Sequence, residues 1–108
     1  MKDSISPDHL IPLINQIHDL KVKVNRKLSE RSVHRNFDRI FRQFETYGLF
    51  YQDPTGEAYS ETRTDCDATI SGNGSQPLTI TEVIKPLVFE KQGDLNQILQ
   101  KAVVIVNG

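Results

Sequence analysis

Apolar positions in the first half of the chain recur at helical spacing. Neither glycine nor proline occurs from Leu13 to Tyr47, and two apolar series step by three or four residues. The first series is Leu10, Leu13, Ile17, Leu20 and Val24, and the second is Val33, Phe37, Ile40, Phe44 and Tyr47. Each series forms one narrow stripe, which predicts two amphipathic helices packed against near-parallel neighbours.

The register of the two series breaks between Asn25 and Ser32. This break predicts a polar turn, with Ser29 or Ser32 as the N-cap of the second helix. An antiparallel helical hairpin is the simplest interpretation, and one bent helix is the alternative.

Capping residues predict where the helices begin and end. The first helix should start at Ser6-Pro7-Asp8, with serine as N-cap and proline at the first helical position. Pro12 predicts a kink or a fresh start, because proline lacks the N–H that continues the helix. Gly48 should end the second helix, since glycine adopts the left-handed C′ conformation without steric cost.

Short extended runs follow Gly48 and are separated by turn residues, which is typical of small antiparallel sheets. The predicted strands cover residues 49–51, 68–70, 78–84, 87–90, 95–99 and 102–106, with turns at 53–56 and 92–94 and a mobile hairpin loop at 71–75. The run 78–84 is the best central strand and stops at Pro86, and 102–106 should be buried on both faces. We therefore expect an α+β fold, with a helical dimerisation segment at 1–48 and an all-β module at 49–108.

Composition places the chain among soluble proteins of one domain. It has 108 residues, of which 37% are apolar and 25% charged, and it contains no tryptophan. A core this thin would benefit from self-association. No apolar run is long enough for a membrane span, and the N-terminus lacks a signal-peptide pattern. The lone Cys66 indicates a reducing compartment, so a cytoplasmic location is expected.

Candidate catalytic chemistry finds no support in the sequence. The three histidines have no recognised ligand spacing, so we expect ordinary surface histidines rather than a metal site. Asp65 and Asp67 flank Cys66 and would raise its pKa, which argues against a nucleophile. No glycine pattern matches a phosphate loop. We therefore expect neither an enzyme nor a bound cofactor.

Positive charge gathers in one segment. Residues 21–42 hold eight basic and two acidic residues, whereas residues 43–108 are acidic overall. Four arginines lie at helical spacing opposite the apolar stripe: Arg31, Arg35, Arg39 and Arg42. Such a face could follow nucleic-acid phosphates with strongly salt-dependent affinity. Because the nearby phenylalanines share the apolar stripe, we favour a solvated or partner-facing surface over nucleic-acid binding.

The apolar stripes support association. A hairpin with one stripe on each helix stays partly uncovered unless the chain's own sheet or a second copy covers it. A two-fold related copy would complete a four-helix bundle, so a homodimer is favoured over a monomer. The predicted dimer interface comprises Leu13, Ile17, Leu20, Val24, Val33, Phe37, Ile40 and Phe44.

Five segments together resemble one known family. They are Leu10-Ile11-Pro12-Leu13-Ile14-Asn15, Phe44-Glu45-Thr46-Tyr47-Gly48-Leu49, Asp53-Pro54-Thr55-Gly56-Glu57-Ala58-Tyr59, Ile80-Thr81-Glu82-Val83-Ile84-Lys85 and Ile98-Leu99-Gln100-Lys101-Ala102-Val103-Val104-Ile105-Val106. In this order they resemble the helical bundle and closing β module of the GrpE family, the nucleotide exchange factors of DnaK-type chaperones.

The resemblance implies a dimeric regulator. Its β module would dock on the nucleotide-binding domain of a DnaK-type chaperone and promote ADP release, without catalytic residue or cofactor. The implied chaperone-binding residues are Gly56, Glu57, Tyr59, Arg63, Lys85 and Gln100. For Gly56 and Tyr59, turn geometry and core packing are an equally good explanation.

The chain also departs from the family pattern. Ser60-Glu61 replaces an aspartate-proline pair, Lys85-Pro86-Leu87 replaces lysine-glycine-tyrosine, and Gln100-Lys101 replaces arginine-proline. Because only about nine residues precede the first of these segments, we expect no counterpart of the family's long N-terminal paired helix. An adaptor that keeps the fold for dimerisation and docking, without exchange activity, is therefore the alternative.

Overall fold

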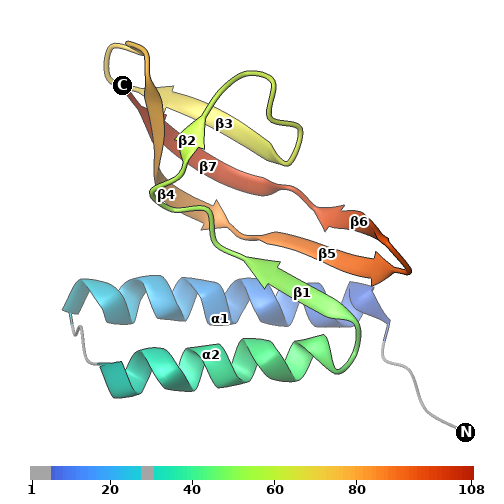
Figure 1. Ribbon diagram of the computed structural model, residues 1–108. Coiled ribbons are helices and arrows are strands. Elements are labelled where there is room, and N and C mark those ends of the chain that lie inside the picture. The colour runs from blue at the N-terminus through green and yellow to red at the C-terminus, as the bar shows by residue number, and fades with distance from the viewer. Residues whose placement is uncertain (1–5, 28–30) are drawn as a thin grey trace, which may run out of the picture.

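The computed structural model describes residues 6–27 and 31–108, and it has the expected α+β fold (Figure 1). Helices α1 (Pro7–Lys27) and α2 (Arg31–Glu45) lie side by side and run antiparallel. The strands in the described residues are β1 (Leu49–Gln52), β2 (Ala58–Tyr59), β3 (Cys66–Ser71), β4 (Leu78–Lys85), β5 (Leu87–Gln92), β6 (Leu95–Gln100) and β7 (Ala102–Asn107). The hairpin is confirmed, and the bent-helix alternative is wrong.

The start of α1 follows the predicted cap. The Asp8 N–H donates to Ser6 Oγ at 3.2 Å, and Pro7 is the first helical residue. The helix continues through Pro12 without a break, so the predicted fresh start is wrong. Proline removes only one backbone hydrogen bond in the second turn. The buried side chains of Leu10 and Ile14, on either side of Pro12, keep this turn packed on the core.

The start of α2 differs from its prediction, whereas its end agrees. Ser32 lies inside α2 and does not cap it, and Ser29 lies outside the described residues. The helix ends at Glu45 and continues into a turn in which the Gly48 N–H donates to the Glu45 carbonyl at 2.9 Å. Gly48 has a φ of +83°, the left-handed conformation that favours glycine.

The strands form two sheets. One has the order β1-β5-β6 and the other the order β2-β4-β7-β3. As predicted, β4 is a central strand and β5 and β6 form a hairpin around residues 93 and 94. Pro86 lies between β4 and β5, where the chain passes from the four-stranded to the three-stranded sheet.

Two expectations about the four-stranded sheet are wrong. β3 pairs in parallel with β7 and not with β4, so residues 71–75 are no hairpin loop and the module is not wholly antiparallel. β7 was expected to be buried on both faces, yet only Ala102, Val104 and Val106 are buried, while Val103 and Ile105 are partly exposed. The helices lie along the three-stranded sheet and leave the second face of β7 without a covering layer (Figure 1).

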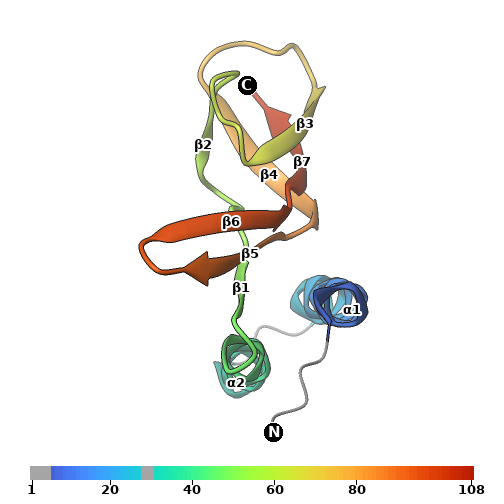
Figure 2. The ribbon, with the colours of Figure 1, turned by 90° about the vertical axis from the view of Figure 1, so that its right-hand side faces the viewer.

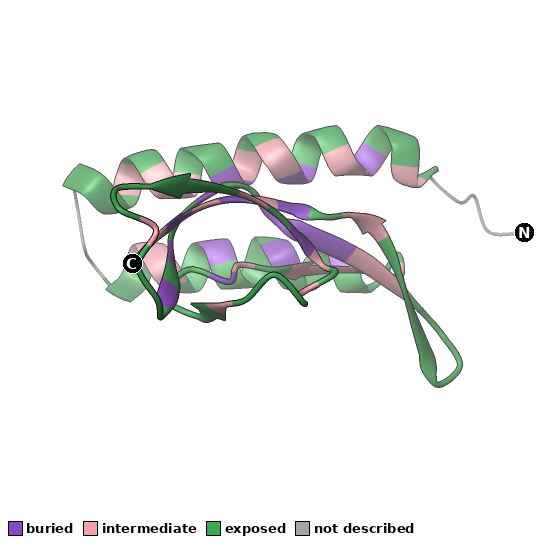
Figure 3. Ribbon diagram, turned by 90° about the horizontal axis from the view of Figure 1, so that it is seen from above, coloured by how far each residue is buried: buried purple, intermediate pink, exposed green. Residues whose placement is uncertain are grey.

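The apolar core has two parts. The first joins both helices to the three-stranded sheet and contains Leu10, Ile14, Phe37, Phe41, Phe44, Leu49 and Val88. The second lies in the four-stranded sheet and contains Cys66, Leu78, Ile80, Val83, Leu87, Ala102, Val104 and Val106. Figure 2 looks along the helices and shows the four-stranded sheet at the opposite end of the molecule from α2. Figure 3 shows buried residues in the middle of the strands and at intervals along both helices.

Helix changes to strand between Glu45 and Leu49, close to the predicted boundary at residue 48. The first core crosses this boundary, so the division into two independent units stays a prediction. No helix within residues 6–27 and 31–108 is long and apolar enough to cross a membrane.

Candidate functional site

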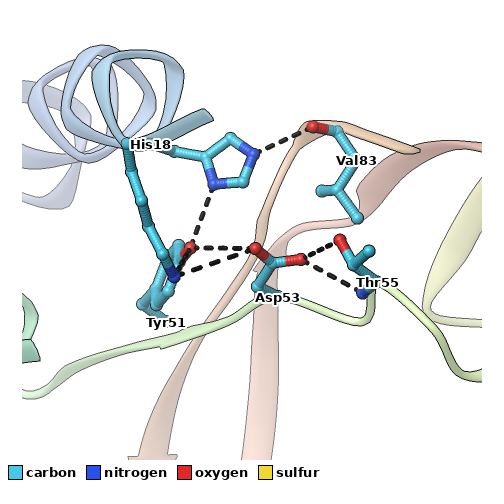
Figure 4. Close-up of polar contacts among 6 residues, drawn as sticks. His18, Tyr51, Asp53, Thr55 and Val83 are labelled. Atoms are coloured by element: carbon cyan, nitrogen blue, oxygen red, sulfur yellow. Dashed lines mark hydrogen bonds and ion pairs between the residues drawn. The ribbon is translucent and has the colours of Figure 1, made fainter. Parts of the chain in front are cut away.

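A buried histidine connects α1 to both sheets. His18 is only 1% exposed, and its Nε2 lies 2.9 Å from the Val83 carbonyl oxygen of β4 (Figure 4). Because a carbonyl oxygen only accepts hydrogen bonds, Nε2 carries the hydrogen. Nδ1 lies 3.0 Å from the Tyr51 hydroxyl of β1. The geometry that joins Nδ1 to the Tyr51 hydroxyl allows either atom to be the donor.

The expectation that the histidines lie at the surface is wrong for His18. It follows Leu10 and Ile14 at intervals of four residues, and these three residues are the buried ones of α1. The predicted apolar stripe comprises Leu10, Leu13, Ile17, Leu20 and Val24, and it includes neither Ile14 nor His18. The spacing of four behind Ile14 is the signal that could have placed His18 on the buried side of the helix.

The Tyr51 hydroxyl lies at the centre of a polar cluster between helix and sheet. It accepts a hydrogen bond from Lys21 Nζ at 3.3 Å and donates one to Asp53 Oδ2 at 3.4 Å. Burial, with Asp53 nearby, raises the pKa of Tyr51 well above its usual value. The phenol thus keeps its hydrogen and remains a donor. Its ring stacks on Phe41, with 3.6 Å between the ring centroids.

Asp53 is held by its own turn. The backbone N–H of Thr55 donates to Asp53 Oδ1 at 3.1 Å, and its Oγ1 donates to the same oxygen at 2.6 Å. The other carboxylate oxygen is 3.9 Å from Lys21 Nζ. Gly56 completes the turn with a φ of +89°. The residues that the sequence marks as a turn thereby orient the carboxylate toward α1 (Figure 4). We call His18, Lys21, Tyr51, Asp53 and Thr55 the polar junction.

A cleft of about 510 Å³ opens beside the polar junction. Its lining residues are Lys21, Val22, Asn25, Arg26, His34, Asp53, Thr55, Thr81 and Glu82. Arg26 and Glu82 pair across it at 3.8 Å, as Lys21 and Asp53 do at 3.9 Å. Throughout the described ranges, each buried side-chain nitrogen or oxygen has a hydrogen-bond partner. These ion pairs and hydrogen bonds are suited to fixing the helices against the sheets.

Four of the predicted chaperone-binding residues lie together near β2. Arg63 Nη2 is 3.1 Å from Glu57 Oε1, and Arg63 Nη1 donates to the Ala58 carbonyl at 3.0 Å. Gly56 and Glu57 are exposed. Tyr59 is partly buried against the second core, which agrees with the packing explanation for this residue.

Arg63 also makes two hydrogen bonds to the Asp65 carboxylate, at 2.9 and 3.1 Å. These bonds lower the pKa of Asp65 and raise that of Arg63. Arg63 therefore fastens the segment after β2 to the start of β3. This role was not visible in the sequence, because it depends on three carbonyl and carboxylate partners that meet only in the fold.

The other two predicted residues lie elsewhere. Lys85 is exposed at the end of β4, about 20 Å along the strand from Thr79, which pairs with Ala58. Gln100 exchanges two amide hydrogen bonds with Asn15 of α1, at 2.8 and 3.0 Å, and donates to the Pro86 carbonyl at 2.9 Å. The six residues thus do not form one patch. Asn15 is a further link between α1 and the β module that sequence reasoning missed.

The predicted dimer-interface residues divide by exposure. Phe37 and Phe44 are buried in the chain's own core, and Ile17, Val24 and Val33 pack partly against it. The exposed members are Leu13 (50%), Leu20 (54%) and Ile40 (39%). A groove of about 400 Å³ runs between the helices and is lined by Leu10, Leu13, Ile17, Ile40, Gln43, Phe44 and Tyr47. The interface stays a prediction, and the groove is the part of it that the chain leaves uncovered.

Cys66 is buried in the second core, and burial raises the pKa of its thiol to about 11. The thiol is therefore protonated at neutral pH, in agreement with a structural role. In the part of the chain that the structure describes, no three His, Cys, Asp or Glu side chains converge as metal ligands would.

Comparison of the chain with protein-family models, with curated proteins and with solved structures found no match. The GrpE resemblance accordingly rests on the sequence segments quoted above.

Proposed function

We propose that this protein is a GrpE-like nucleotide exchange factor, which binds the nucleotide-binding domain of a DnaK-type chaperone and promotes ADP release. The observation that carries the proposal is the order of five family-like segments along a chain whose helical hairpin precedes a β module. An α+β arrangement in this order is what the resemblance implies. The alternative is an adaptor that docks without promoting exchange.

Such a factor acts through binding energy alone. It favours the open form of its partner by binding that form more tightly than the closed one, and each tenfold difference in affinity corresponds to about 1.4 kcal/mol. Binding at the β module can affect the position of the helices only if the helices and the β module move together. The polar junction and the Asn15–Gln100 amide pair supply contacts of this kind.

The exposed turn after β1 is the part of the proposed docking surface that we would test first. Glu57 is exposed, and Arg63 holds its carboxylate at 3.1 Å, so its charge has a defined position. Asp94 offers a matched control, because it is an exposed acid in the β5–β6 turn.

The experiment measures the release rate of a fluorescent ADP analogue from the same organism's DnaK-type chaperone. We expect acceleration that saturates with protein concentration, a loss of at least tenfold in half-maximal potency for Glu57→Lys, and little change for Asp94→Lys. No acceleration by folded, dimeric protein would refute exchange activity and favour the adaptor. Equal loss in both variants would remove the turn at Glu57 from the docking surface.

The proposal includes a homodimer formed through the groove between the helices. Leu13 and Ile40 line this groove from opposite helices and are substantially exposed, so aspartate at either position leaves the chain's own core intact. Phe37→Asp would bury a charge in that core and would test folding instead.

Sedimentation measures the mass of the parent protein and of the variants Leu13→Asp and Ile40→Asp, and so distinguishes dimers from monomers. Ile70→Asp is the control, because Ile70 is 51% exposed on β3, away from the groove. We expect dimers for the parent and for the control, and folded monomers for the two groove variants. A parent protein that sediments as a monomer at micromolar concentration would contradict the dimer.

A further inference from the structure

Four of the chain's six arginines lie on one narrow face of α2. At 3.6 residues per turn, Arg31, Arg42, Arg35 and Arg39 fall at about 0°, 20°, 40° and 80° around the helix axis. The buried residues Phe37, Phe41 and Phe44 fall between about 220° and 280°. The arginines therefore point away from the core, and all four are exposed.

No ion pair joins these four arginines to another residue that the structure describes, whereas Arg26 and Arg63 each pair with carboxylates. The helix contains no lysine, so the positive charge is carried by guanidinium groups alone. Beside the arginines, at about 100° to 140°, lie the exposed hydrogen-bonding side chains of Ser32, Gln43 and Asn36. The face thus offers fixed positive charge and neutral polar groups, and the exposed Asp38 lies at its edge, at about 340°.

The location of α2 keeps this face accessible. Figure 2 shows α2 at the end of the molecule farthest from the four-stranded sheet. The apolar groove adjoins this face, because Gln43 and Ile40, which line it, fall at about 120° and 180°. A second copy seated on the groove would leave the arginines at 0° to 40° uncovered.

We propose that this arginine face of α2 binds the phosphate backbone of a nucleic-acid duplex. The guanidinium group presents paired N–H donors that match the spacing of phosphate oxygens. The ammonium group of lysine has no such pair of fixed donors. From Arg31 to Arg42 the helix rises about 16 Å, a length along which one strand of a duplex passes about five phosphates. Four arginines along this length can each reach a separate phosphate.

The structure favours a duplex over the other polyanions. Insertion into an anionic membrane would need an apolar face beside the charges. The phenylalanines of α2 are buried in the core, and in the dimer proposed above the second copy covers the groove that contains Leu13 and Ile40. Single strands are held largely by stacking on aromatic rings, which this face lacks. Contacts of this kind position a duplex without reading its sequence, so we expect binding to be independent of sequence.

The test measures affinity for a short duplex by fluorescence anisotropy between 50 and 200 mM salt. With four phosphate contacts, the slope of log K against log salt should be about −3.6, which weakens binding about 150-fold over this range. For Arg35→Gln/Arg39→Gln the slope should fall to about −1.8. The matched control, Lys91→Gln/Lys101→Gln, removes the same charge from exposed positions of the β module and should leave the slope unchanged.

A further variant, Arg35→Lys/Arg39→Lys, keeps the charge and should keep the slope while weakening affinity several-fold. All substituted positions are exposed, so far-UV circular dichroism should show the parent fold. The proposal is overturned if the duplex does not bind, if the control loses as much as the arginine variant, or if the slope is unaffected. Salt-sensitive binding to anionic vesicles or polyglutamate, without binding to the duplex, would overturn it as well.

Discussion

Replacing Tyr51 with phenylalanine tests the polar junction by removing one atom. The ring would keep its stacking on Phe41, and Lys21 would keep its contact with Asp53. The loss falls on His18, whose Nδ1 has the Tyr51 hydroxyl as its hydrogen-bond partner in a site that is 1% exposed. A buried donor or acceptor left without its hydrogen-bond partner costs about 1–3 kcal/mol.

We therefore expect Tyr51→Phe to lower the free energy of unfolding by about 2 kcal/mol. At a typical m-value for urea, this shifts the unfolding midpoint down by about 1 M with an unchanged slope. Far-UV circular dichroism is the suitable signal, since the chain has no tryptophan. Tyr47→Phe is the matched control, because Tyr47 is largely exposed, and it should change stability by less than about 0.5 kcal/mol.

A double-mutant cycle assigns the effect to the contact itself. His18→Leu, alone and combined with Tyr51→Phe, should give a coupling of about 0.5–3 kcal/mol, the range for residues that share a hydrogen-bond network. If Tyr51→Phe unfolds at the parent midpoint, or if the two substitutions are simply additive, the polar junction does not hold α1 to the sheets as argued.

Three further predictions concern stability and reactivity. The pKa of Asp65 is lowered by Arg63, so this pair stabilises the fold above the ordinary aspartate pKa of about 3.9, and the contribution disappears as the pH falls through the lower folded-state pKa. Arg63→Gln should thus lower the urea midpoint at pH 7, and the two midpoints should converge in acid; a constant difference would contradict the assignment. Iodoacetamide at pH 8 should modify Cys66 slowly in the native protein and quickly in urea, because its pKa is about 11; equal rates, followed by mass spectrometry, would refute its burial. Ile14→Ala should cost about 2–5 kcal/mol by urea unfolding and Ile70→Ala less than about 1 kcal/mol, since the first is fully buried and the second half exposed; similar costs would contradict the core.

Local signals in the sequence were sufficient for most of the secondary structure. Gly48, the turn at residues 53–56 and Pro86 act on the backbone within a few residues, so each ends or turns an element wherever the chain folds. The position of the arginines opposite the apolar stripe is equally local, because it follows from the helical repeat alone. These features are where the predictions from sequence and the structure agree.

An apolar stripe was correctly predicted on α1, but the residues of α1 that are buried lie on a different side of the helix from most of that stripe. Helical periodicity gives a wide apolar face, and it does not say which part of that face meets the chain's own sheet. In the fold, Leu10, Ile14 and His18 are buried, while Leu13 borders the groove and Leu20 is exposed. A polar residue on the buried side is identified only once its partners are known.

The sequence by itself determined the helical hairpin, all the strands that follow it except β2, and the arginine face of α2, because capping, turn chemistry and periodicity act over a few residues. Only the tertiary structure decided that β3 pairs with β7, that His18 meets Tyr51 and Val83, and that Gln100 turns toward Asn15. These partners are separated by about 30 to 85 positions along the chain. Such contacts depend on how whole elements pack and which loops can close, and no local pattern encodes that.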